Sequence, residues 1–253
     1  MSRRTTDKSR CAVINLGMME YQTAYSYQQF LVAARAQDRI PNLLLLVEHH
    51  PVYTIGRSGN RRNILVNDED LANLGVQVYC IDRGGDVTYH GPGQLVGYPI
   101  IKLQGETRDL HRLIYLYEEV MIRLVATYGL KAGRLSGFPG AWVGQKKIGA
   151  IGIGVSHWVS FHGFALNIAP QMEYFRYIIP CGIRGRGVTC LADELGCLVD
   201  YADLVDRLIS SFSVVMAADC YQTRIADLGL DDFSWEERGD GRQWKRSRGC
   251  RPG

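Results

Sequence analysis

The sequence predicts one α+β domain built on a mixed or mainly antiparallel sheet with helices. Strand-like segments come in consecutive runs rather than in strict alternation with helices, which favours this class over a doubly wound parallel sheet. Only a few long segments, such as residues 20–36 and 108–128, carry apolar side chains at helical spacing. The 253 residues are 46% hydrophobic and 22% charged, which is typical of a soluble globular protein that buries a sizeable core.

In the first half of the chain, strands are predicted where short apolar runs end at turn-forming residues. These runs cover residues 11–16, 43–48, 52–55, 76–81 and 95–101. Residues 20–36 are expected to form a helix. Asn67 is expected to cap a short helix whose first turn holds Asp68 and Glu69.

The second half begins with the helix expected over residues 108–128, which has one apolar stripe. Residues 141–143 and 147–155 predict a hairpin across 144–146, followed by a strand over 161–168. Thr189 is expected to cap a turn over 190–195. Asp200 is expected to open a last helix that reaches about Cys220.

The two ends of the chain are expected to be disordered extensions of the domain. Residues 1–10 are polar and lack the apolar stretch of a secretory signal, and residues 231–253 form a polar, basic tail. The domain is therefore placed at residues 11–230. The longest apolar run, residues 43–47, is only strand-sized, so the sequence predicts no membrane span and a cytoplasmic protein.

Charge and cysteine content exclude several other classes. A net charge of +3 is too small to indicate nucleic-acid binding. The seven cysteines are odd in number and include no C-x-x-C pair, which argues against a disulfide framework and a zinc ribbon. No two histidines lie at i,i+4 and no acidic cluster accompanies them, so no metal site is expected.

The segment RGGDVTYHGPGQLVGYPI, residues 83–100, is the most informative in the chain. Its Gly-Gly and Gly-Pro-Gly steps permit positive φ and close approach of the backbone, and polar side chains lie between them. Polar groups held between such turns usually meet a ligand. The alternative is a surface hairpin with an unusually polar turn.

Cys181, in the segment IIPCGIRGRG, is a candidate nucleophile on a rigid, exposed turn. The reactive species is the thiolate, so a catalytic cysteine needs a neighbouring group that stabilises the anion. Arg184 and Arg186 are close in sequence, and Lys147 is a candidate in space. The alternative is a buried structural thiol followed by a loop.

Lys147 opens the segment KIGAIGIGV, whose small residues suggest a surface for an apolar ligand. Strand alternation places Lys147, Gly149, Ile151, Ile153 and Val155 on one face, and Ile148, Ala150, Gly152 and Gly154 on the other. The second face is nearly bare, and HGFALN, residues 162–167, repeats the pattern. A long, thin apolar ligand would fit against the backbone of such a face. Tight packing of the sheet against a helix would use the same residues.

The remaining polar candidates are histidines and arginines. His49, His90 and His162 are expected to form hydrogen bonds rather than to bind metal. Arg57, Arg61 and Arg62 form a small basic patch that would attract an anionic partner, although a solvated loop would look the same.

Taken in order, these motifs resemble the octanoyltransferase family of lipoate biosynthesis. The motifs are HHPVYTIGRSGNRRNIL, RGGDVTYHGPGQLVGYP, GAWVGQKKIGAIG, SFHGFALN and IIPCGI. The resemblance runs from about residue 43 to about residue 195, and several ordered motifs are far more specific than one glycine-rich loop.

The resemblance implies a fold like the catalytic domain of biotin and lipoate protein ligases, with helices on one side of the sheet. It implies Cys181 as nucleophile and Lys147 as its activating lysine. It also implies the following acyl-substrate contacts: Arg83, Gly84, Gly85, Asp86, Val87, Thr88, Tyr89, His90, Ala150, Ile151, Gly152, Gly163, Phe164 and Ala165.

The implied reaction moves an octanoyl group from acyl carrier protein to a lysine of lipoyl domains, in 2-oxoacid dehydrogenases and in the glycine cleavage H protein. The Lys147 ammonium would stabilise the Cys181 thiolate, and backbone N–H groups near Lys147–Ile148 or Gly182 would hold the oxyanion. A thioester acyl-enzyme conserves the energy of the donor thioester, so no ATP or other cofactor is needed. Neither nucleic acid nor membrane is an expected partner.

Four other functions use the same sequence features. An ATP-dependent lipoate or biotin ligase would share the scaffold without needing a nucleophilic cysteine. An amidotransferase would take the acyl group from another lipoylated-type protein. A non-catalytic acyl-chain or carrier-binding module would need the groove but not the thiol. A Cys/His hydrolase would use His90 or His162 as its base.

Overall fold

The computed structural model describes residues 9–183 and 185–230, and its centre is a nine-stranded mixed sheet. The strands of this sheet are β1 (Ser9–Met19), β2 (Asn42–His49), β6 (Gln94–Ile100), β7 (Gly133–Leu135), β8 (Phe138–Val143), β9 (Lys146–Ser156), β10 (Val159–Asn167), β11 (Gly187–Val188) and β12 (Ala218–Gln222).

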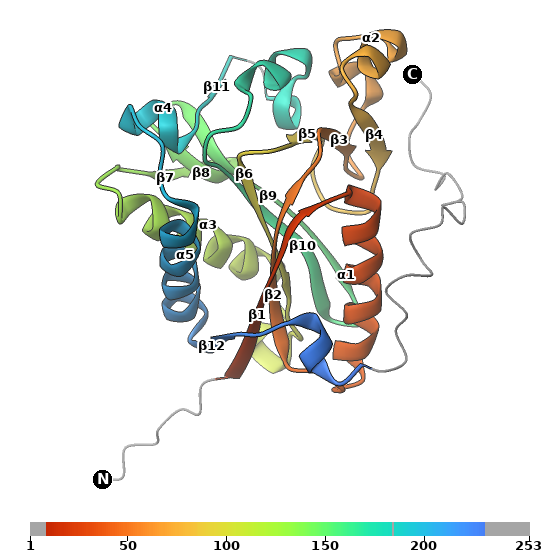
Figure 1. Ribbon diagram of the computed structural model, residues 1–253, viewed down its shortest axis with the longest axis vertical. Helices are drawn as coiled ribbons and strands as arrows, with labels where there is room; N and C mark the ends of the chain where they lie inside the picture. The colour runs from red at the N-terminus through yellow and green to blue at the C-terminus, as the bar shows by residue number, and fades with distance from the viewer. Residues whose placement is uncertain (1–8, 184, 231–253) are drawn as a thin grey trace.

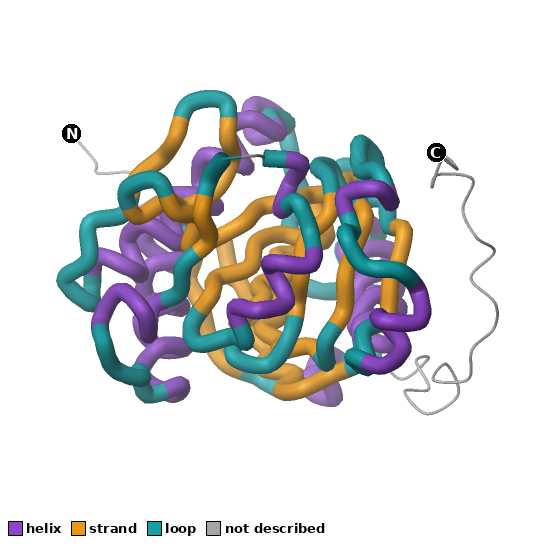
Figure 2. The backbone as a smooth tube through the Cα atoms, turned by 90° about the horizontal axis from the view of Figure 1, so that it is seen from above, coloured by secondary structure: helices purple, strands orange, loops and turns teal. Residues whose placement is uncertain are grey.

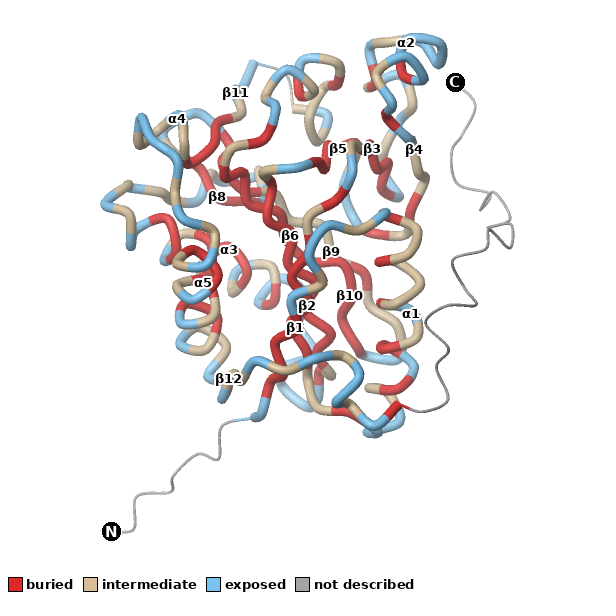
Figure 3. Tube along the Cα trace, viewed as in Figure 1, coloured by how far each residue is buried: buried red, intermediate tan, exposed pale blue. Residues whose placement is uncertain are grey.

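The strand order is β12-β1-β2-β6-β10-β9-β8-β7, with β11 added beside β9. β1 runs parallel to both β12 and β2, whereas β2, β6, β10, β9 and β8 pair antiparallel in succession. Every residue of β6 and β10 is buried, and the central strands form the buried spine of the molecule (Figure 3). The mixed α+β class is therefore confirmed.

Helices cover both faces of this sheet, so the expectation of helices on one side is wrong. α1 (Tyr21–Ala36) lies on one face, and α3 (Leu110–Ala126) and α5 (Tyr201–Met216) lie on the other (Figure 1). Viewed from above, the strands lie between these helical layers (Figure 2). β2 serves both faces because its side chains alternate: Leu44 and Leu46 pack with α3 and α5, and Leu43 and Leu45 pack with α1.

A second, three-stranded sheet lies at the end of the main sheet where α1 begins (Figure 1). It comprises β3 (Val52–Ile55), β4 (Gln77–Cys80) and β5 (Val87–His90), with α2 (Asp68–Asn73) beside them. Asn67 caps α2, since its Oδ1 accepts a hydrogen bond from the Asp70 N–H at 2.8 Å, as predicted. Tyr53, Val87 and Tyr89 form the core of this small sheet.

Short helical turns lie between the longer elements, and some of them link the two sheets. They are η1 (Arg61–Asn63), η2 (Gly105–Thr107), η3 (Met172–Tyr177), η4 (Pro180–Gly182), α4 (Leu191–Leu195) and η5 (Ile225–Leu228). The Ile179 N–H donates to the Asn63 carbonyl at 2.7 Å, and Ile64 forms a bridge with Ile178. Further along, β11 pairs with Lys146 and Lys147 of β9. The segment between Ile178 and Val188 is thus held by the small sheet at one end and by the main sheet at the other.

Three local predictions are wrong. Cys190, not Thr189, is the N-cap of α4, and the Thr189 hydroxyl instead donates to Glu194 Oε1 at 2.6 Å. The last helix ends at Met216, and Cys220 lies in β12 opposite Cys11. Of the predicted N-terminal extension, residues 9 and 10 already belong to β1, while residues 1–8 and the predicted tail at 231–253 lie outside the described residues. None of the helices in the described ranges is long and apolar enough to cross a membrane.

Candidate active site

A thiol and an amine from distant parts of the chain meet at the junction of the two sheets. Cys181 lies on η4 in a left-handed conformation, with φ 55° and ψ 21°, and is partly exposed. Lys147, on β9, places Nζ 3.5 Å from Cys181 Sγ. A non-glycine residue in this region of φ/ψ space carries strain that is often associated with functional sites.

The predicted face of Lys147 is wrong, because β9 contains a bulge at Ile148 that interrupts the strand alternation. Trp142 pairs with Lys147, but the preceding Ala141 pairs with Gly149, so Ile148 is the extra residue. Ile148 packs in the core beneath α3, and a β-carbon on Gly149 would lie 2.5 Å from Met121 Sδ of the same helix. The bulge therefore turns Lys147 toward the face that carries Gly152, opposite to the prediction.

The Lys147 ammonium is held in a specific position. Its side chain is largely buried, at 7% exposure for the residue, and Nζ donates to the Pro139 carbonyl at 3.1 Å. Nζ also lies 5.0 Å from the centre of the Trp142 ring, within the range of a cation–π contact. These contacts leave Nζ directed at the Cys181 sulfur.

One suggested oxyanion donor is already used. The Gly182 N–H donates to the Ile179 carbonyl at 3.0 Å within the turn, so it does not point freely at an acyl group on Cys181. A β-carbon on Gly182 would lie 2.7 Å from Asp86 Oδ2, which shows how closely the two loops approach. Asp86 Oδ1 accepts hydrogen bonds from the N–H groups of Asn60 and Val87, so it joins the loop at residue 60 to the start of β5.

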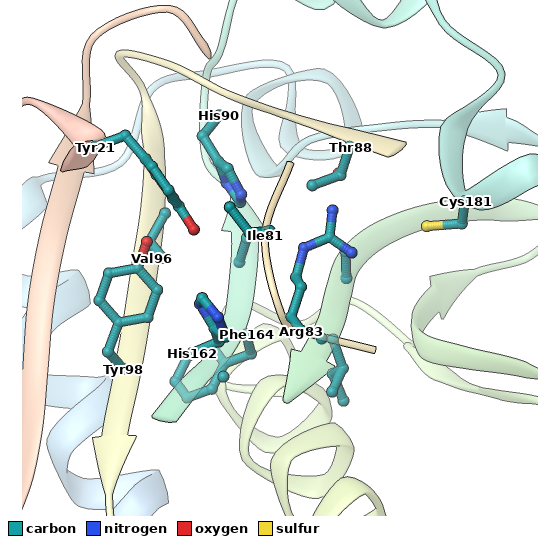
Figure 4. Close-up of a pocket in the computed structure, with 15 residues that line it drawn as sticks. Tyr21, Ile81, Arg83, Thr88, His90, Val96, Tyr98, His162, Phe164 and Cys181 are labelled. Atoms are coloured by element: carbon teal, nitrogen blue, oxygen red, sulfur yellow. The ribbon is translucent and has the colours of Figure 1, made fainter. Parts of the chain in front are cut away.

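An inner cavity extends from Cys181 between the sheets (Figure 4). The cavity is narrow, with a free volume of about 30 Å³. Nine of the predicted contact residues line it, namely Arg83, Thr88, His90, Ala150, Ile151, Gly152, Gly163, Phe164 and Ala165. A β-carbon at Gly152 would lie 2.6 Å from Arg83 Cδ, so the bare face of β9 makes room for the arginine as well as for the cavity.

An outer pocket opens from the same sulfur to the surface. Its free volume is about 610 Å³, and its lining includes Gly84, Gly85 and Asp86. Val87 and Tyr89 line neither space, because alternate side chains of β5 point into the core of the small sheet. The structure therefore brings together every predicted site residue except these two.

Arg83 is the central polar group of the inner cavity. Nη2 donates to the Thr54 carbonyl at 2.8 Å and to its hydroxyl at 2.9 Å, and Nη1 donates to the Gly84 carbonyl at 3.0 Å. Burial lowers the pKa of this guanidinium, and the neighbouring Cys181 acts in the opposite direction. Arg83 is thus a second cationic neighbour of the sulfur, whereas Arg186, suggested from its sequence position, lies over the Phe138 ring at 5.7 Å.

His90 connects Arg83 to the core by hydrogen bonds. Its Nε2 lies 3.5 Å from the Thr54 hydroxyl, and its Nδ1 lies 2.7 Å from Gln94 Oε1. Burial lowers the pKa of His90 to about 3, so the ring is neutral near pH 7. Because the amide oxygen of Gln94 can only accept, Nδ1 carries the proton and Nε2 accepts from Thr54.

The same chain of hydrogen bonds continues to Lys147. Gln94 Nε2 donates to Asn167 Oδ1 at 2.9 Å, and Asn167 Nδ2 donates to the Thr189 carbonyl at 2.9 Å. The Thr189 N–H then donates to the Lys147 carbonyl at 3.0 Å. Each of these polar groups is buried and paired, so the network fixes the backbone that carries the lysine.

The other histidines also have structural partners. His162 Nε2 lies 2.9 Å from Asp82 Oδ1, and burial lowers its pKa despite that carboxylate. His49 Nε2 lies 2.7 Å from the Tyr98 hydroxyl, and burial lowers the pKa of His49 to about 4. Within residues 9–183 and 185–230, no group of three or more His, Cys, Asp or Glu residues is arranged to hold a metal ion.

Several lining residues were not predicted from sequence. Tyr21, Ile81, Val96 and Tyr98 complete the inner cavity, and Pro139 supplies the carbonyl that holds Lys147. Tyr21 begins α1, a helix that appears in the sequence only as an amphipathic element. Nothing in the sequence near Tyr21 indicates a ligand, and only the packing of α1 against the sheet brings it to the cavity.

The sequence of this chain matches a known protein family. The lipoyl protein ligase A/B catalytic domain matches residues 20–213. An octanoyltransferase of Caldicellulosiruptor bescii is 48% identical over 205 residues, covering 80% of this chain and 90% of its own. An octanoyltransferase of Alkaliphilus metalliredigens is 43% identical over 212 residues, covering 83% of this chain and 97% of its own.

The fold agrees with that placement. A crystal structure of lipoate-protein ligase A bound with ATP superposes with a TM-score of 0.70 at 17% identity, covering 90% of this chain and 96% of its own. With both the sequence and the fold in agreement, the chain belongs to the octanoyltransferase family of acyltransferases, within the wider family of the lipoyl protein ligase A/B catalytic domain.

Proposed function

We propose that this protein transfers an octanoyl group from octanoyl-acyl carrier protein to a lysine of lipoyl domains, through a thioester on Cys181. The observation that carries the proposal is the 3.5 Å approach of Lys147 Nζ to Cys181 Sγ at the junction of two pockets. The inner, mainly apolar cavity suits an alkyl chain, and the outer pocket suits the thioester arm of a carrier protein.

In the first step, the Cys181 thiolate attacks the carbonyl carbon of the donor thioester. A new C–S bond forms to Cys181, the old C–S bond breaks, and the released carrier thiolate takes up a proton. Lys147 and Arg83 supply the positive charge that favours the thiolate. The acyl chain then runs from Cys181 past Arg83 toward Val96 and Tyr98, along the lined cavity.

In the second step, the amine of the acceptor lysine attacks the same carbonyl carbon. A C–N bond forms, the C–S bond to Cys181 breaks, and the proton lost by the amine passes to Lys147 or to the departing sulfur. The proposed acceptors are the lipoyl domains of 2-oxoacid dehydrogenases and the glycine cleavage H protein. No cofactor enters this sequence, and we place the reaction in the cytoplasm.

The first experiment is intact mass spectrometry of the purified protein after incubation with octanoyl-acyl carrier protein. We expect an octanoyl adduct that is absent from Cys181→Ser and is discharged when a lipoyl domain is added. A folded Cys181→Ser variant that retains substantial transfer activity would contradict the nucleophile assignment. Labelling of a lipoyl domain by free octanoate only when ATP is present would favour a ligase instead.

The side chains near Cys181 also bear on the three other candidate functions, a hydrolase, a binding module and an amidotransferase. Among the described residues, the side chain that hydrogen-bonds to Cys181 Sγ is Lys147, whereas the rings of His90 and His162 pair with Gln94 and Asp82. This favours the lysine over either histidine as the partner of the thiol. A binding module would not need the amine beside the thiol. An amidotransferase would use the same pair, and it differs only in accepting octanoyl from a lipoyl-type domain, which the same mass assay tests.

A further inference from the structure

We propose that Glu118, a buried carboxylate on α3 outside both pockets, is a positioning residue that acts on Lys147 through the Pro139–Gly140 peptide group. This inference rests on the proposed Cys181–Lys147 pair and adds a residue to it. Glu118 lies outside the sequence motifs and outside the lining of both pockets, and hydrogen bonds through one peptide group link it to the lysine.

The first link is between Lys147 and the peptide. Nζ donates to the Pro139 carbonyl oxygen at 3.1 Å. That oxygen and the Gly140 N–H are the two ends of one planar, resonance-coupled amide, so a hydrogen bond made at one end polarises the other.

The second link is between the peptide and the carboxylate. The Gly140 N–H donates to Glu118 Oε1 at 2.9 Å in a buried environment, and Glu118 is only 8% exposed. Its other oxygen, Oε2, accepts from Arg134 Nε at 2.9 Å. A hydrogen bond from an amide to a carboxylate is charge-assisted and short. The anion therefore increases the negative charge on the carbonyl oxygen that faces the Lys147 ammonium.

The position of this peptide requires glycine. Gly140 has φ +133°, and a β-carbon there would lie 2.4 Å from the Gly149 carbonyl oxygen and 3.4 Å from Lys147 Cε. Without a side chain, the peptide fits between Glu118 and the lysine. A role limited to anchoring the β7–β8 hairpin would not require the carbonyl to face Nζ.

Several charged groups surround this link. Arg123 pairs with Glu119 at 2.9 Å, and Arg186 lies over the ring of Phe138, next to Pro139. Arg134 also donates to Glu119 Oε2 at 2.9 Å, so the carboxylates of Glu118 and Glu119 share one guanidinium. On the other side of the lysine lie Cys181 and, beyond it, Arg83. Removing the charge of Glu118 should therefore make Lys147 lose its proton at a lower pH.

The test measures the titration of Lys147 directly, independent of any transfer assay. The chain contains only six lysines, so ¹³Cε resonances of labelled protein can be followed against pH, with Lys147→Arg to assign the signal. In Glu118→Gln, which keeps an oxygen for the Gly140 N–H, the midpoint for Lys147 should fall below that of the wild type. The alkaline limb of the pH profile for acyl-enzyme formation should fall with it.

Glu119→Gln is the matched control, because it removes a neighbouring carboxylate that contacts the same arginine but not Gly140. An unchanged Lys147 midpoint in Glu118→Gln, or an equal shift in Glu119→Gln, would overturn the proposal.

If Glu118→Gln does not fold, Arg134→Gln provides the test instead. This variant removes the cation that pairs with the Glu118 carboxylate, so the titration midpoint of Lys147 should rise. An unchanged or lower midpoint of Lys147 would refute the link. Failure of the transfer assay with a shifted midpoint would count against the proposed function and not against this link.

Discussion

At the scale of single residues, the reactivity of Cys181 should depend on its two cationic neighbours, and Lys147 lies directly against the sulfur. In Lys147→Ala the thiolate loses its nearest positive charge. We expect the rate of iodoacetamide alkylation of Cys181 to reach its midpoint about one or more pH units higher than in the wild type. Lys146→Ala is the control, since Lys146 is exposed and pairs with Glu194. An identical pH profile in Lys147→Ala would exclude the pair as a functional unit.

Buried neutral histidines should make the fold sensitive to acid. Burial lowers the pKa of His90 to about 3, whereas an unfolded histidine titrates near 6.5. Between these values the unfolded chain binds more protons than the folded one, so stability falls as pH falls below about 6.5. Each such histidine steepens this dependence by up to roughly 1.4 kcal/mol per pH unit.

Denaturant unfolding of His90→Gln at pH 6.5, 5.5 and 4.5 tests this. We expect the free energy of unfolding to depend less steeply on pH than in the wild type, even if the variant is less stable at every pH. His50→Gln, at an exposed position, should keep the wild-type slope. Equal slopes in the wild type and His90→Gln would show that the ring is not the neutral, desolvated group described above.

At the scale of secondary-structure elements, β6 sets the depth of the inner cavity. Val96 projects from β6 into the lining beside Tyr98, away from Cys181 in the cavity (Figure 4). In Val96→Phe the larger side chain should exclude the end of an eight-carbon chain. Each excluded CH₂ removes about 0.8 kcal/mol, or about fourfold in kcat/KM.

Acyl carrier proteins bearing four-, six- and eight-carbon chains measure this change. We expect Val96→Phe to prefer the shorter chains and Val96→Ala to retain or extend the preference for eight carbons. An unchanged ratio of kcat/KM values in a folded Val96→Phe would place the alkyl chain elsewhere.

The elements also show what the sequence could not predict. The resemblance treats residues 83–90 as one continuous contact motif, yet β5 alternates its side chains, so Thr88 and His90 reach the cavity and Val87 and Tyr89 do not. The bulge at Ile148 reverses the expected face of Lys147 because a period of two cannot reveal an extra residue. β12 was missed because only its pairing with β1 distinguishes it from the end of a helix.

Other features were predictable because they are local or motif-based. The α+β class, the two long helices and the cap at Asn67 follow from periodicity and capping chemistry. The approach of Lys147 to Cys181, 34 residues apart in sequence, came from the family resemblance and not from any spacing rule. Nothing in the sequence indicates a functional role for Glu118, because it is one of several charged residues in the helix α3.

At the scale of the whole molecule, basic side chains lie near the outer pocket. Arg57, which precedes Ser58 of the pocket lining, is exposed, and so is Arg62, whereas Arg61 pairs with Asp68. Such side chains would steer an acidic carrier protein toward Cys181. Replacing both arginines by alanine should slow association with an acidic carrier roughly tenfold at low salt and weaken its salt dependence.

Stopped-flow association with a fluorescent carrier protein measures this effect. Arg224→Ala is the control, because Arg224 precedes η5 at the end of the molecule opposite the small sheet (Figure 1). Equal association rates for the double variant and the control, or discharge of the acyl-enzyme slowed as much as its formation, would assign the arginines another role.

Cys181, the proposed nucleophile, lies on a segment attached beside both sheets, so the position of its sulfur depends on how the two sheets are aligned. Ile179 is hydrogen-bonded to Asn63 beside the small sheet, and Val188 pairs with Lys147 itself. Any displacement of one sheet against the other changes the distance between Sγ and Nζ, even while each sheet remains folded. If the proposed pair carries the activity, a small shift between the two sheets should lower activity before the protein unfolds, and the alkylation rate of Cys181 would record that shift.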